Sequence, residues 1–201
     1  MCQYNFYSML QRQHNIQRWA LMHNTYNESV AAHSRDVAVI AHALAEIGNR
    51  YCGKKYNAER VALLALYHDV PEIITGDMPT PVKHLPGMRV VFQEVEDNAS
   101  ELLLGMLPKD MGVSHEFRSL FFKEDEDAAL WYLIKAADKI SALIKCQKEE
   151  FLGNREFLQA KAAQLESLKG MYCQEAGLFL RWFMDGFTMS LDETVGGESN
   201  A

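Results

Sequence analysis

The stretch LYHDVPEIITGDMPTP, residues 66–81, places a histidine and an aspartate directly after an apolar run and just before a proline. The preceding run VALLALY, residues 61–67, has the composition of a buried helix. Pro71 disfavours helical dihedrals at Val70 but suits the first position of a new turn, so we expect the chain to bend just after His68 and Asp69. An imidazole and a carboxylate are costly at the end of a buried helix unless they have a partner. The pair therefore marks a candidate functional site.

Outward from this stretch, apolar residues recur at helical spacing in almost every segment, whereas the alternation typical of strands is rarely sustained. The sequence predicts an all-α fold. Asn57 is the expected N-cap of the helix that leads to His68, and the Gly- and Pro-rich segment 75–87 is expected to be a loop. In the longest helix, acids crowd the start and Lys145 and Lys148 lie toward the end, as the helix dipole favours. The expected helices are 28–50, 57–69, 88–106, 127–149, 155–168 and 172–191.

Composition predicts one soluble domain. The chain has 201 residues, 48% of them hydrophobic and 23% charged, which allows one substantial core. Acidic residues outnumber basic ones by 27 to 20, and the net charge of -7 disfavours a nucleic-acid polymer as partner. The four cysteines are scattered, and no segment resembles a leader or the apolar run of about 18 residues that spans a membrane. We expect a cytoplasmic protein with free thiols, no membrane association and a frayed tail from about residue 194.

Two further polar residues share predicted apolar helical faces. His33 lies four residues before Val37 on an inward-facing stripe, and Asp138 lies among apolar residues of the longest helix. Each alone has an ordinary explanation, since a single buried histidine is more often a hydrogen-bonded core residue. Together with His68 and Asp69 they offer imidazole and carboxylate ligands, which suit manganese, iron, cobalt or zinc. Two histidines and two aspartates from three helices would leave one or two positions open for water or phosphate.

The pattern of His33, the pair His68 and Asp69, and Asp138 resembles the HD superfamily of metal-dependent phosphohydrolases. Four segments closely resemble the bacterial YfbR-type 5'-deoxyribonucleotidases: QRWALM (17–22), AHS (32–34), YHDVPEIITGDMPTPVK (67–83) and KAADKISALIKCQKE (135–149). The resemblance covers most of the chain and implies a single compact HD-domain helical bundle over residues 1–201 that forms a homodimer. It implies hydrolysis of deoxyribonucleoside 5'-monophosphates to deoxynucleoside and phosphate.

Carried over residue by residue, the resemblance makes His33, His68, Asp69 and Asp138 the ligands of a divalent cation such as cobalt or manganese. It also implies that Glu72 positions or activates the attacking water. Glu72 lies four residues after His68, so a helical turn after Pro71 would direct its carboxylate to the same side as that ligand. Taken alone, Glu72 would equally fit a solvated acid in the first turn of a helix.

The same resemblance implies the residues that contact the substrate. The Arg18 guanidinium can hold phosphate oxygens, and the Trp19 indole can cover the phosphate or sugar and exclude water. Asp77 is expected to accept a hydrogen bond from the deoxyribose 3'-hydroxyl, although alone it would fit an ordinary turn residue after Gly76. The remaining implied substrate contacts come from His33, Asp69, Met78, Pro79, Thr80 and Asp138.

Some features leave alternatives open. Ala20 and Ala32 stand where relatives often have Pro and Glu, which leaves the ligands intact but can change their support. His84 follows the segment 67–83 and could touch the substrate, though a surface role fits better.

The same four metal ligands would also serve a hydrolase of deoxynucleoside triphosphates or of a cyclic or signalling nucleotide. A third alternative is a metal-dependent nucleotide sensor without turnover.

Overall fold

The structure is a computed structural model that describes residues 4–83 and 85–196. Over these residues it consists of helices and has no strand, apart from one isolated antiparallel bridge between Gln17 and Ser29. The predicted all-α fold is thus confirmed. Within the same residues, no helix has both the length and the apolar character needed to cross a membrane. The predicted tail lies only partly inside the described range, because Val195 and Gly196 follow the last helix and residues 197–201 lie outside it.

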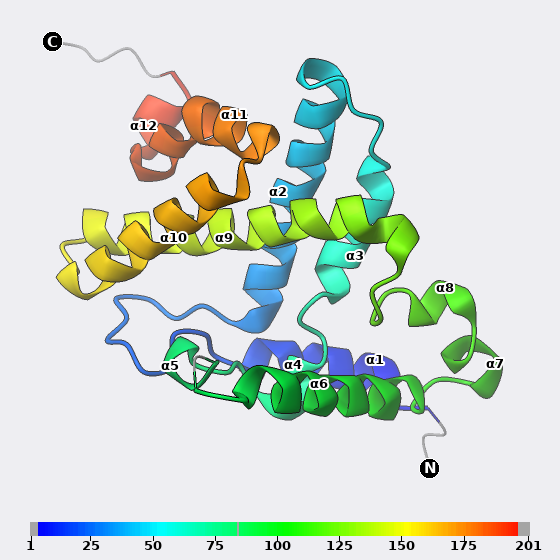
Figure 1. The fold of residues 1–201 in the computed structure, drawn as a ribbon. Coiled ribbons are helices and arrows are strands. Elements are labelled where there is room, and N and C mark those ends of the chain that lie inside the picture. The colour runs from blue at the N-terminus through cyan, green and yellow to red at the C-terminus, as the bar shows by residue number, and fades with distance from the viewer. Residues whose placement is uncertain (1–3, 84, 197–201) are drawn as a thin grey trace, which may run out of the picture.

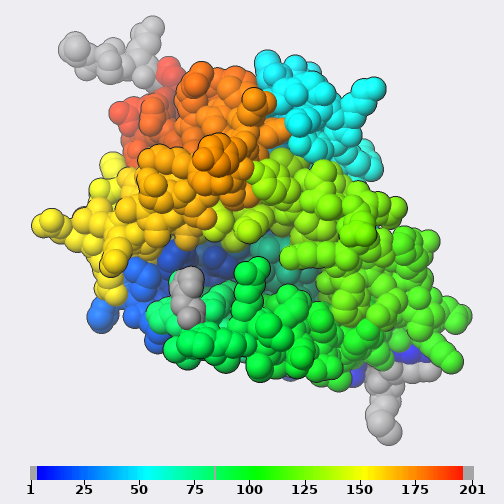
Figure 2. All heavy atoms as spheres, viewed as in Figure 1, coloured from blue at the N-terminus to red at the C-terminus, as the bar shows by residue number. Residues whose placement is uncertain are grey.

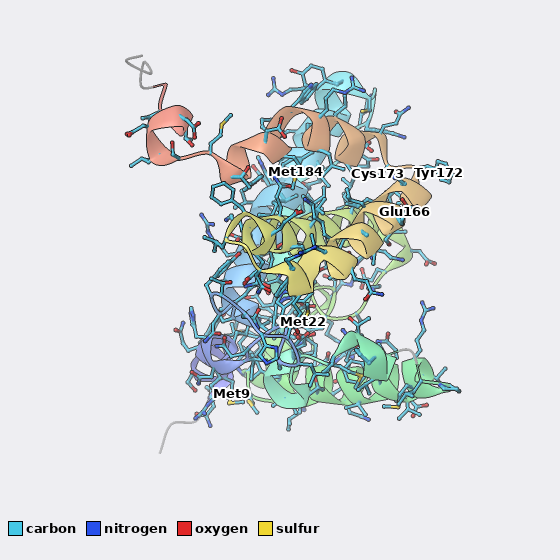
Figure 3. All side chains as sticks on the ribbon, turned by 90° about the vertical axis from the view of Figure 1, so that its left-hand side faces the viewer. Met9, Met22, Glu166, Tyr172, Cys173 and Met184 are labelled. Carbon is cyan, nitrogen blue, oxygen red and sulfur yellow. The ribbon has the colours of Figure 1, made fainter. Side chains whose placement is uncertain are left out.

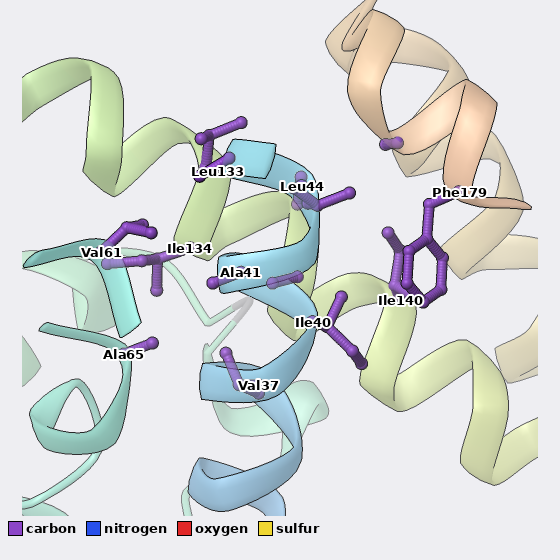
Figure 4. Packing of buried hydrophobic residues seen from close by; sticks show 14 of the residues in the cluster. Val37, Ile40, Ala41, Leu44, Val61, Ala65, Leu133, Ile134, Ile140 and Phe179 are labelled. Atoms are coloured by element: carbon purple, nitrogen blue, oxygen red, sulfur yellow. The ribbon is translucent and has the colours of Figure 1, made fainter. Parts of the chain in front are cut away.

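Three helices form the centre of the fold, and α2 packs against both others (Figure 1). They are α2 (Val30–Tyr51), α3 (Ala58–Tyr67) and α9 (Ala128–Phe151). Their apolar stripes meet in the larger core, which Figure 4 shows from close by. Its members include Val37, Ala41, Leu44, Val61, Ala65, Leu133 and Ile140. The side chain of Asn57 accepts from the backbone N–H of Arg60, so the predicted N-cap of α3 is present.

A second layer lies below this centre in Figure 1 and supports the turn after α3. It contains α1 (Phe6–Leu10), α4 (Glu72–Thr75) and α6 (Met88–Leu104). Val70 and Ile73, which flank Pro71, are buried in a smaller core together with Phe6, Leu103, Leu104 and Leu107. In the turned view of Figure 3, Met9 marks this lower layer, whereas Cys173 and Met184 mark the larger core above it. The turn that carries His68 and Asp69 is therefore packed between the two cores.

The remaining helices frame these layers. Helix α10 folds back along α9, and α11 lies against α2 (Figure 1). Their bounds are α5 (Thr80–Lys83), α7 (Lys109–Gly112), α8 (His115–Arg118), α10 (Leu158–Met171), α11 (Gln174–Phe183) and α12 (Leu191–Thr194). Short 3-10 turns occur at η1 (Gln11–Asn15), η2 (Asp125–Asp127), η3 (Arg155–Phe157) and η4 (Met184–Thr188).

Two local predictions were wrong, and one helix was missed. The segment predicted as one helix over 172–191 is broken into α11, η4 and α12, because Ser190 forms a capping box with Glu193 and starts a new helix. The expected loop 75–87 contains the one-turn helix α5. Helix α1, which buries Phe6, was not predicted, since five residues are too few for a periodic signal.

Candidate metal centre

Four side chains from three parts of the fold meet at one place. His33 lies in the first turns of α2, His68 and Asp69 follow the end of α3, and Asp138 lies in α9. Nε2 of His33 is 3.1 Å from Oδ1 of Asp138 and 3.5 Å from Oδ2 of Asp69. Nε2 of His68 is 3.0 Å from the same Oδ2 of Asp69. We call these four residues the His/Asp cluster.

Local hydrogen bonds set the direction in which both imidazoles present their nitrogens. Nδ1 of His68 lies 2.7 Å from the carbonyl oxygen of Ala65, and because a carbonyl only accepts, Nδ1 carries the proton. The lone pair of His68 is therefore on Nε2, which faces Asp69. Nδ1 of His33 lies 3.2 Å from the Ser141 hydroxyl of α9, so the Nε2 of this ring also faces the cluster. A second partner that fixes the ring in this way is the usual arrangement of a histidine that binds a metal.

The donor set fits a divalent cation. Nε2 of His33 and Nε2 of His68 are buried and make no hydrogen bond to any described residue. Nitrogen and oxygen ligands at about 2.1 Å from an ion lie roughly 3.0 to 3.4 Å apart around it, for octahedral or tetrahedral angles. The three separations of 3.0, 3.1 and 3.5 Å match this spacing. His33, His68 and Asp138 also offer three ligand atoms that all lie within 4.8 Å of one another.

The charges in the cluster keep its carboxylates ionised. Burial alone would raise the pKa of Asp69, but His68, His33 and Arg18 outweigh it and hold that pKa well below its usual range. The pKa of Asp138 is likewise lowered to about 2, because His33 and Arg18 outweigh the effect of burial. For His68, burial opposes protonation, but the neighbouring Asp69 prevails and raises the pKa. A proton and a cation therefore compete for Nε2 of His68.

Glu72 begins α4, one turn after Asp69, and has only 4% of its surface exposed. Its Oε2 is buried and has no hydrogen-bond partner within the part of the chain that the structure describes. Burial raises the pKa of Glu72, and the negative charges of Asp69 and Asp77 raise it further. The turn after Pro71 is helical, as the sequence-based argument for Glu72 required.

Arg18 and Trp19 lie in a loop, residues 17–29, that enters α2. One guanidinium nitrogen of Arg18, Nη1, lies 3.5 Å from Oδ2 of Asp69, so the positive charge of Arg18 lies beside the cluster. Burial would lower the pKa of Arg18, but Asp138, Asp69 and Glu28 outweigh it, so this residue stays charged. The Trp19 ring packs on Phe157, with ring centroids 5.4 Å apart.

The segment expected to bind the sugar connects α4 with α5. Asp77 is half-buried, and burial raises its pKa while Arg18 and Lys83 lower it. Met78 and Pro79 are also half-buried, whereas Thr80 is exposed at the start of α5. Arg18 thus acts electrostatically on both Asp69 and Asp77 and connects the two parts of the site. His84 lies outside the described residues.

A cleft of about 560 Å³ reaches the cluster from the side of α6 and α9, where Figure 2 shows a hollow. Its lining includes His68, Asp69 and Asp138 of the cluster, together with residues that include Arg89, Gln93, Lys123, Trp131 and Lys135. Asp138 lies among the buried residues Leu130, Ile134 and Ala137 of α9, and its own side chain is 39% exposed. The cleft gives a ligand direct access to the cluster.

A second group of possible ligands lies on the surface. His115 stands 3.2 Å from Glu124 and 3.8 Å from Glu126, with its side chain 66% exposed. Exposed acidic groups of this kind are ordinary surface ion pairs and contribute little to stability. The buried His/Asp cluster is the better candidate for a metal centre.

The fold is that of the HD-domain phosphohydrolases. It resembles a solved HD-domain phosphohydrolase from Listeria innocua with a TM-score of 0.79 at 22% identity, over 91% of this chain and 88% of that one. It also resembles an HD phosphohydrolase of cyanophage S-2L, solved with dA and one catalytic Zn²⁺ ion, with a TM-score of 0.63 at 16% identity. That comparison covers 89% of this chain and 96% of the other.

Within this class, the chain belongs to the family described as 5'-deoxynucleotidase YfbR-like, whose model matches residues 5–187. It is 43% identical over 194 residues to a 5'-deoxynucleotidase of Yersinia pestis, strain Pestoides F, covering 94% of this chain and 95% of the relative. A 5'-deoxynucleotidase of Yersinia pseudotuberculosis serotype O:1b has the same identity and coverage. The family membership expected from the sequence is confirmed.

Proposed function

We propose that this protein is a metal-dependent 5'-deoxynucleotidase that releases phosphate from deoxyribonucleoside 5'-monophosphates. The observation that carries the proposal is the meeting of His33, His68, Asp69 and Asp138 beside an open cleft, which the last three of them line. The family membership and the 43% identical 5'-deoxynucleotidases support the choice of substrate.

The four residues of the His/Asp cluster would hold the divalent cation, with cobalt or manganese as our proposed occupants. When bound there, the cation supplies the Lewis acidity that phosphate ester hydrolysis requires. The side chains contribute two neutral nitrogens and two carboxylates, and this mixed set suits both ions. The carboxylates are already ionised in the fold, since the pKa values of Asp69 and Asp138 are lowered.

Arg18 and Trp19 would bind the phosphate end of the substrate. The guanidinium of Arg18 lies beside Asp69, remains charged and can offset the negative charge of the phosphate. Trp19 supplies an apolar wall that excludes water from the same region. Asp77, with Met78, Pro79 and Thr80, would contact the deoxyribose and accept a hydrogen bond from its 3'-hydroxyl. His33, Asp69 and Asp138 would contact the phosphate in addition to their role as ligands.

Glu72 would act on the water that attacks phosphorus. Its Oε2 is buried and unpartnered among the described residues, so it can accept a proton from that water and hold it. Burial, together with the negative charges of Asp69 and Asp77, raises the pKa of Glu72 to about 9, which favours the protonated form. A cation held by the His/Asp cluster would offset these negative charges and favour the ionised carboxylate, which is the form that accepts a proton. Water and the departing 5'-oxygen would then lie on opposite sides of phosphorus.

A phosphate-release panel tests this proposal. Purified protein is incubated with deoxy- and ribonucleoside monophosphates, and separately with dGTP, in the presence of manganese, cobalt, magnesium or chelator. We expect phosphate from dAMP and dTMP with manganese or cobalt, less from ribonucleotides, and none with chelator. Release of triphosphate from dGTP would instead support a triphosphohydrolase, and nucleotide binding without any release would support a sensor.

We further propose that residues 1–201 form a single domain that works as a homodimer in the cytoplasm. Partly buried Tyr67 and Phe121 pack against both core clusters, which supports one domain.

Trp182 and Phe183 of α11 are 44% and 48% exposed and offer an apolar surface for a second copy. The free thiols of Cys52, Cys146 and Cys173 support a reducing compartment. Light scattering after size-exclusion chromatography measures the oligomeric state directly.

A further inference from the structure

Glu28 makes contact with both residues that the proposed function assigns to the phosphate end of the substrate. Nε of Arg18 donates to Oε2 of Glu28 at 3.2 Å, and Nε1 of Trp19 donates to the same oxygen at 2.8 Å. Only 13% of the Arg18 side chain and 11% of the Glu28 side chain are exposed, so solvent screens this ion pair weakly. One carboxylate oxygen thus connects the guanidinium and the indole.

The backbone holds Glu28 opposite these two residues. The backbone N–H of Arg18 donates to the carbonyl of Glu28 at 2.9 Å, next to the bridge between Gln17 and Ser29. Ser29 is the N-cap of α2 and accepts from the N–H of Ala32, and His33 follows in the same turn of helix. Glu28 is therefore fixed directly at the start of the helix that carries a residue of the His/Asp cluster.

This connection sets where Arg18 points. Its Nε is held by Glu28, so the other end of the planar guanidinium is directed at Asp69, where Nη1 lies 3.5 Å from Oδ2. A guanidinium presents its donors in a fixed fork, so anchoring one nitrogen orients the remaining ones. Without Glu28, Arg18 would face only the carboxylates of the cluster and could rotate toward them.

Trp19 needs a restraint for a separate reason. Its φ of 59° lies in the left-handed region, which is rare for a bulky residue that is not glycine. Backbone strain of this kind persists only where surrounding contacts hold it, and it concentrates at functional sites. The contacts that hold Trp19 include the hydrogen bond from its indole to Glu28, the packing on Phe157, and hydrogen bonds to its carbonyl from the Asn24 side chain and the backbone N–H of Met22.

We propose that Glu28 is a positioning residue that fixes Arg18 and Trp19 together in the orientation needed to receive the substrate phosphate. This inference rests on the proposed function for its catalytic readout, but its structural content can be measured without turnover. Glu28 does not belong to the His/Asp cluster, so its removal leaves all four cluster side chains in place.

Three variants separate positioning from charge. In Glu28→Ala, both donors lose their acceptor, and we expect kcat/KM for dAMP to fall about 10- to 100-fold, mainly through KM. In Glu28→Gln, the amide oxygen has two lone pairs and can accept from both donors, so kcat/KM should stay within about threefold of the parent. Glu46→Ala removes a half-buried glutamate of α2 that pairs with the exposed Arg50, and serves as the matched control.

A background variant distinguishes positioning from a general effect on folding. In Arg18→Ala/Trp19→Phe protein, neither donor remains, so adding Glu28→Ala should change kcat/KM by less than about twofold. An equal loss in both backgrounds would overturn the proposal, because it would show that Glu28 acts independently of Arg18 and Trp19. Manganese affinity, measured by calorimetry, should be the same in the parent, Glu28→Gln and Glu46→Ala proteins.

The readout that does not need turnover is the indole N–H signal of Trp19 in a ¹H–¹⁵N NMR spectrum. The chain has three tryptophans, and Trp19→Phe identifies the signal by its loss. Glu28→Ala should shift this signal and speed its exchange with water, while Glu28→Gln and Glu46→Ala should preserve it. An unchanged signal in Glu28→Ala would overturn the positioning role. If the signal responds as expected but no nucleotide releases phosphate, the proposed function fails and the contact to Glu28 stands.

Discussion

Helix α9 contributes to two groups of charged side chains. The two groups differ in whether their polar atoms have hydrogen-bond partners. Near its middle, Asp138 joins the His/Asp cluster, in which Nε2 of His33 and of His68 lack hydrogen-bond partners among the described residues. Two turns later, Lys145 and Glu149 form a buried ion pair, with 1% and 0% of their side chains exposed. We call this second group the Lys145 cluster.

The Lys145 cluster satisfies its own charges. Lys145 donates to the carbonyl of Tyr26 at 2.6 Å, and Glu149 accepts from the backbone N–H of Thr25 at 3.0 Å and from Asn154 at 2.8 Å. It thereby attaches the loop of residues 17–29 to α9. Buried charged groups whose polar atoms all have hydrogen-bond partners indicate a structural role. Buried polar atoms without such partners indicate a site that binds a ligand. Exposure points the same way, since the side chain of Asp138 is 39% exposed at the cleft whereas those of Lys145 and Glu149 are closed off from solvent.

The largest effect is expected from Asp69→Asn. The substitution removes the carboxylate that lies within 3.5 Å of both histidines, so the cation loses a ligand. Phosphate release from dAMP should fall below detection, a larger loss than the roughly 100-fold that follows loss of a supporting partner. Manganese affinity should fall with it in calorimetry. His115→Ala, at the exposed surface group, should leave both unchanged, and an Asp69→Asn protein with a tenth of the parental rate would contradict the assignment.

Glu72→Gln should reduce kcat by about 10² to 10⁴ while KM and manganese affinity stay close to parental values. The reason is that Glu72 holds a proton during the reaction but does not bind the cation or the phosphate. Steady-state kinetics with dAMP, combined with calorimetry, measures all three quantities. If Glu72→Gln protein released phosphate at the parental rate, another group would have to accept the proton.

Substitutions in the Lys145 cluster should change the free energy of unfolding. Lys145→Met leaves Glu149 buried without its cation, and the free energy of unfolding should fall by about 3–5 kcal/mol in urea titrations. The double variant Lys145→Met/Glu149→Leu removes both charges and should recover much of this loss. Lys161→Met breaks a more exposed pair with Glu150 and should change stability by at most about 1 kcal/mol. Equal losses in Lys145→Met and Lys161→Met would contradict a structural role for the cluster.

A smaller effect is expected in acid. Burial alone would raise the pKa of Glu149, but the hydrogen bonds from Lys145, Thr25 and Asn154 lower it to about 2. Because the folded-state pKa is below the unfolded value, its stabilising contribution is full above about pH 4.3 and is lost as the pH falls toward 2. Glu149→Gln should therefore lose less stability than the parent between pH 5 and pH 2.5 in urea titrations. Parallel losses in the two proteins would show that Glu149 is not a source of the acid sensitivity.

The sequence predicted the long helices and the His/Asp cluster because both leave local signals. Apolar spacing placed α2, α3 and α9 within a few residues of their observed ends, and Asn57 marked a cap. His33 and the His68–Asp69 pair stood out because polar side chains on apolar helical stripes require an explanation. The short elements α1, α5, α7 and α8 were not predicted, since one turn of helix contains too few residues to show a period.

The residues that support the site gave no such signal. Glu28 precedes a serine in a polar loop, and its contacts to Arg18 and Trp19 depend on a loop closure that periodicity does not show. The sequence indicated only that Lys145 lies near the helix C-terminus, where the helix dipole favours a positive charge. The carbonyl of Tyr26, to which it donates, lies 119 residues away in the chain, so no local pattern reveals this contact. The cleft lining from α6 was likewise missed, because residues of both α6 and α9 line the cleft and periodicity does not show which helices face each other.

The most direct test of the metal centre is an anomalous difference map from crystals grown with cobalt. We predict one strong peak per chain at about 2.0–2.2 Å from Nε2 of His33, Nε2 of His68 and carboxylate oxygens of Asp69 and Asp138. A map with no peak among these four side chains, or with its strongest peak at the exposed group of His115, Glu124 and Glu126, would contradict the assignment.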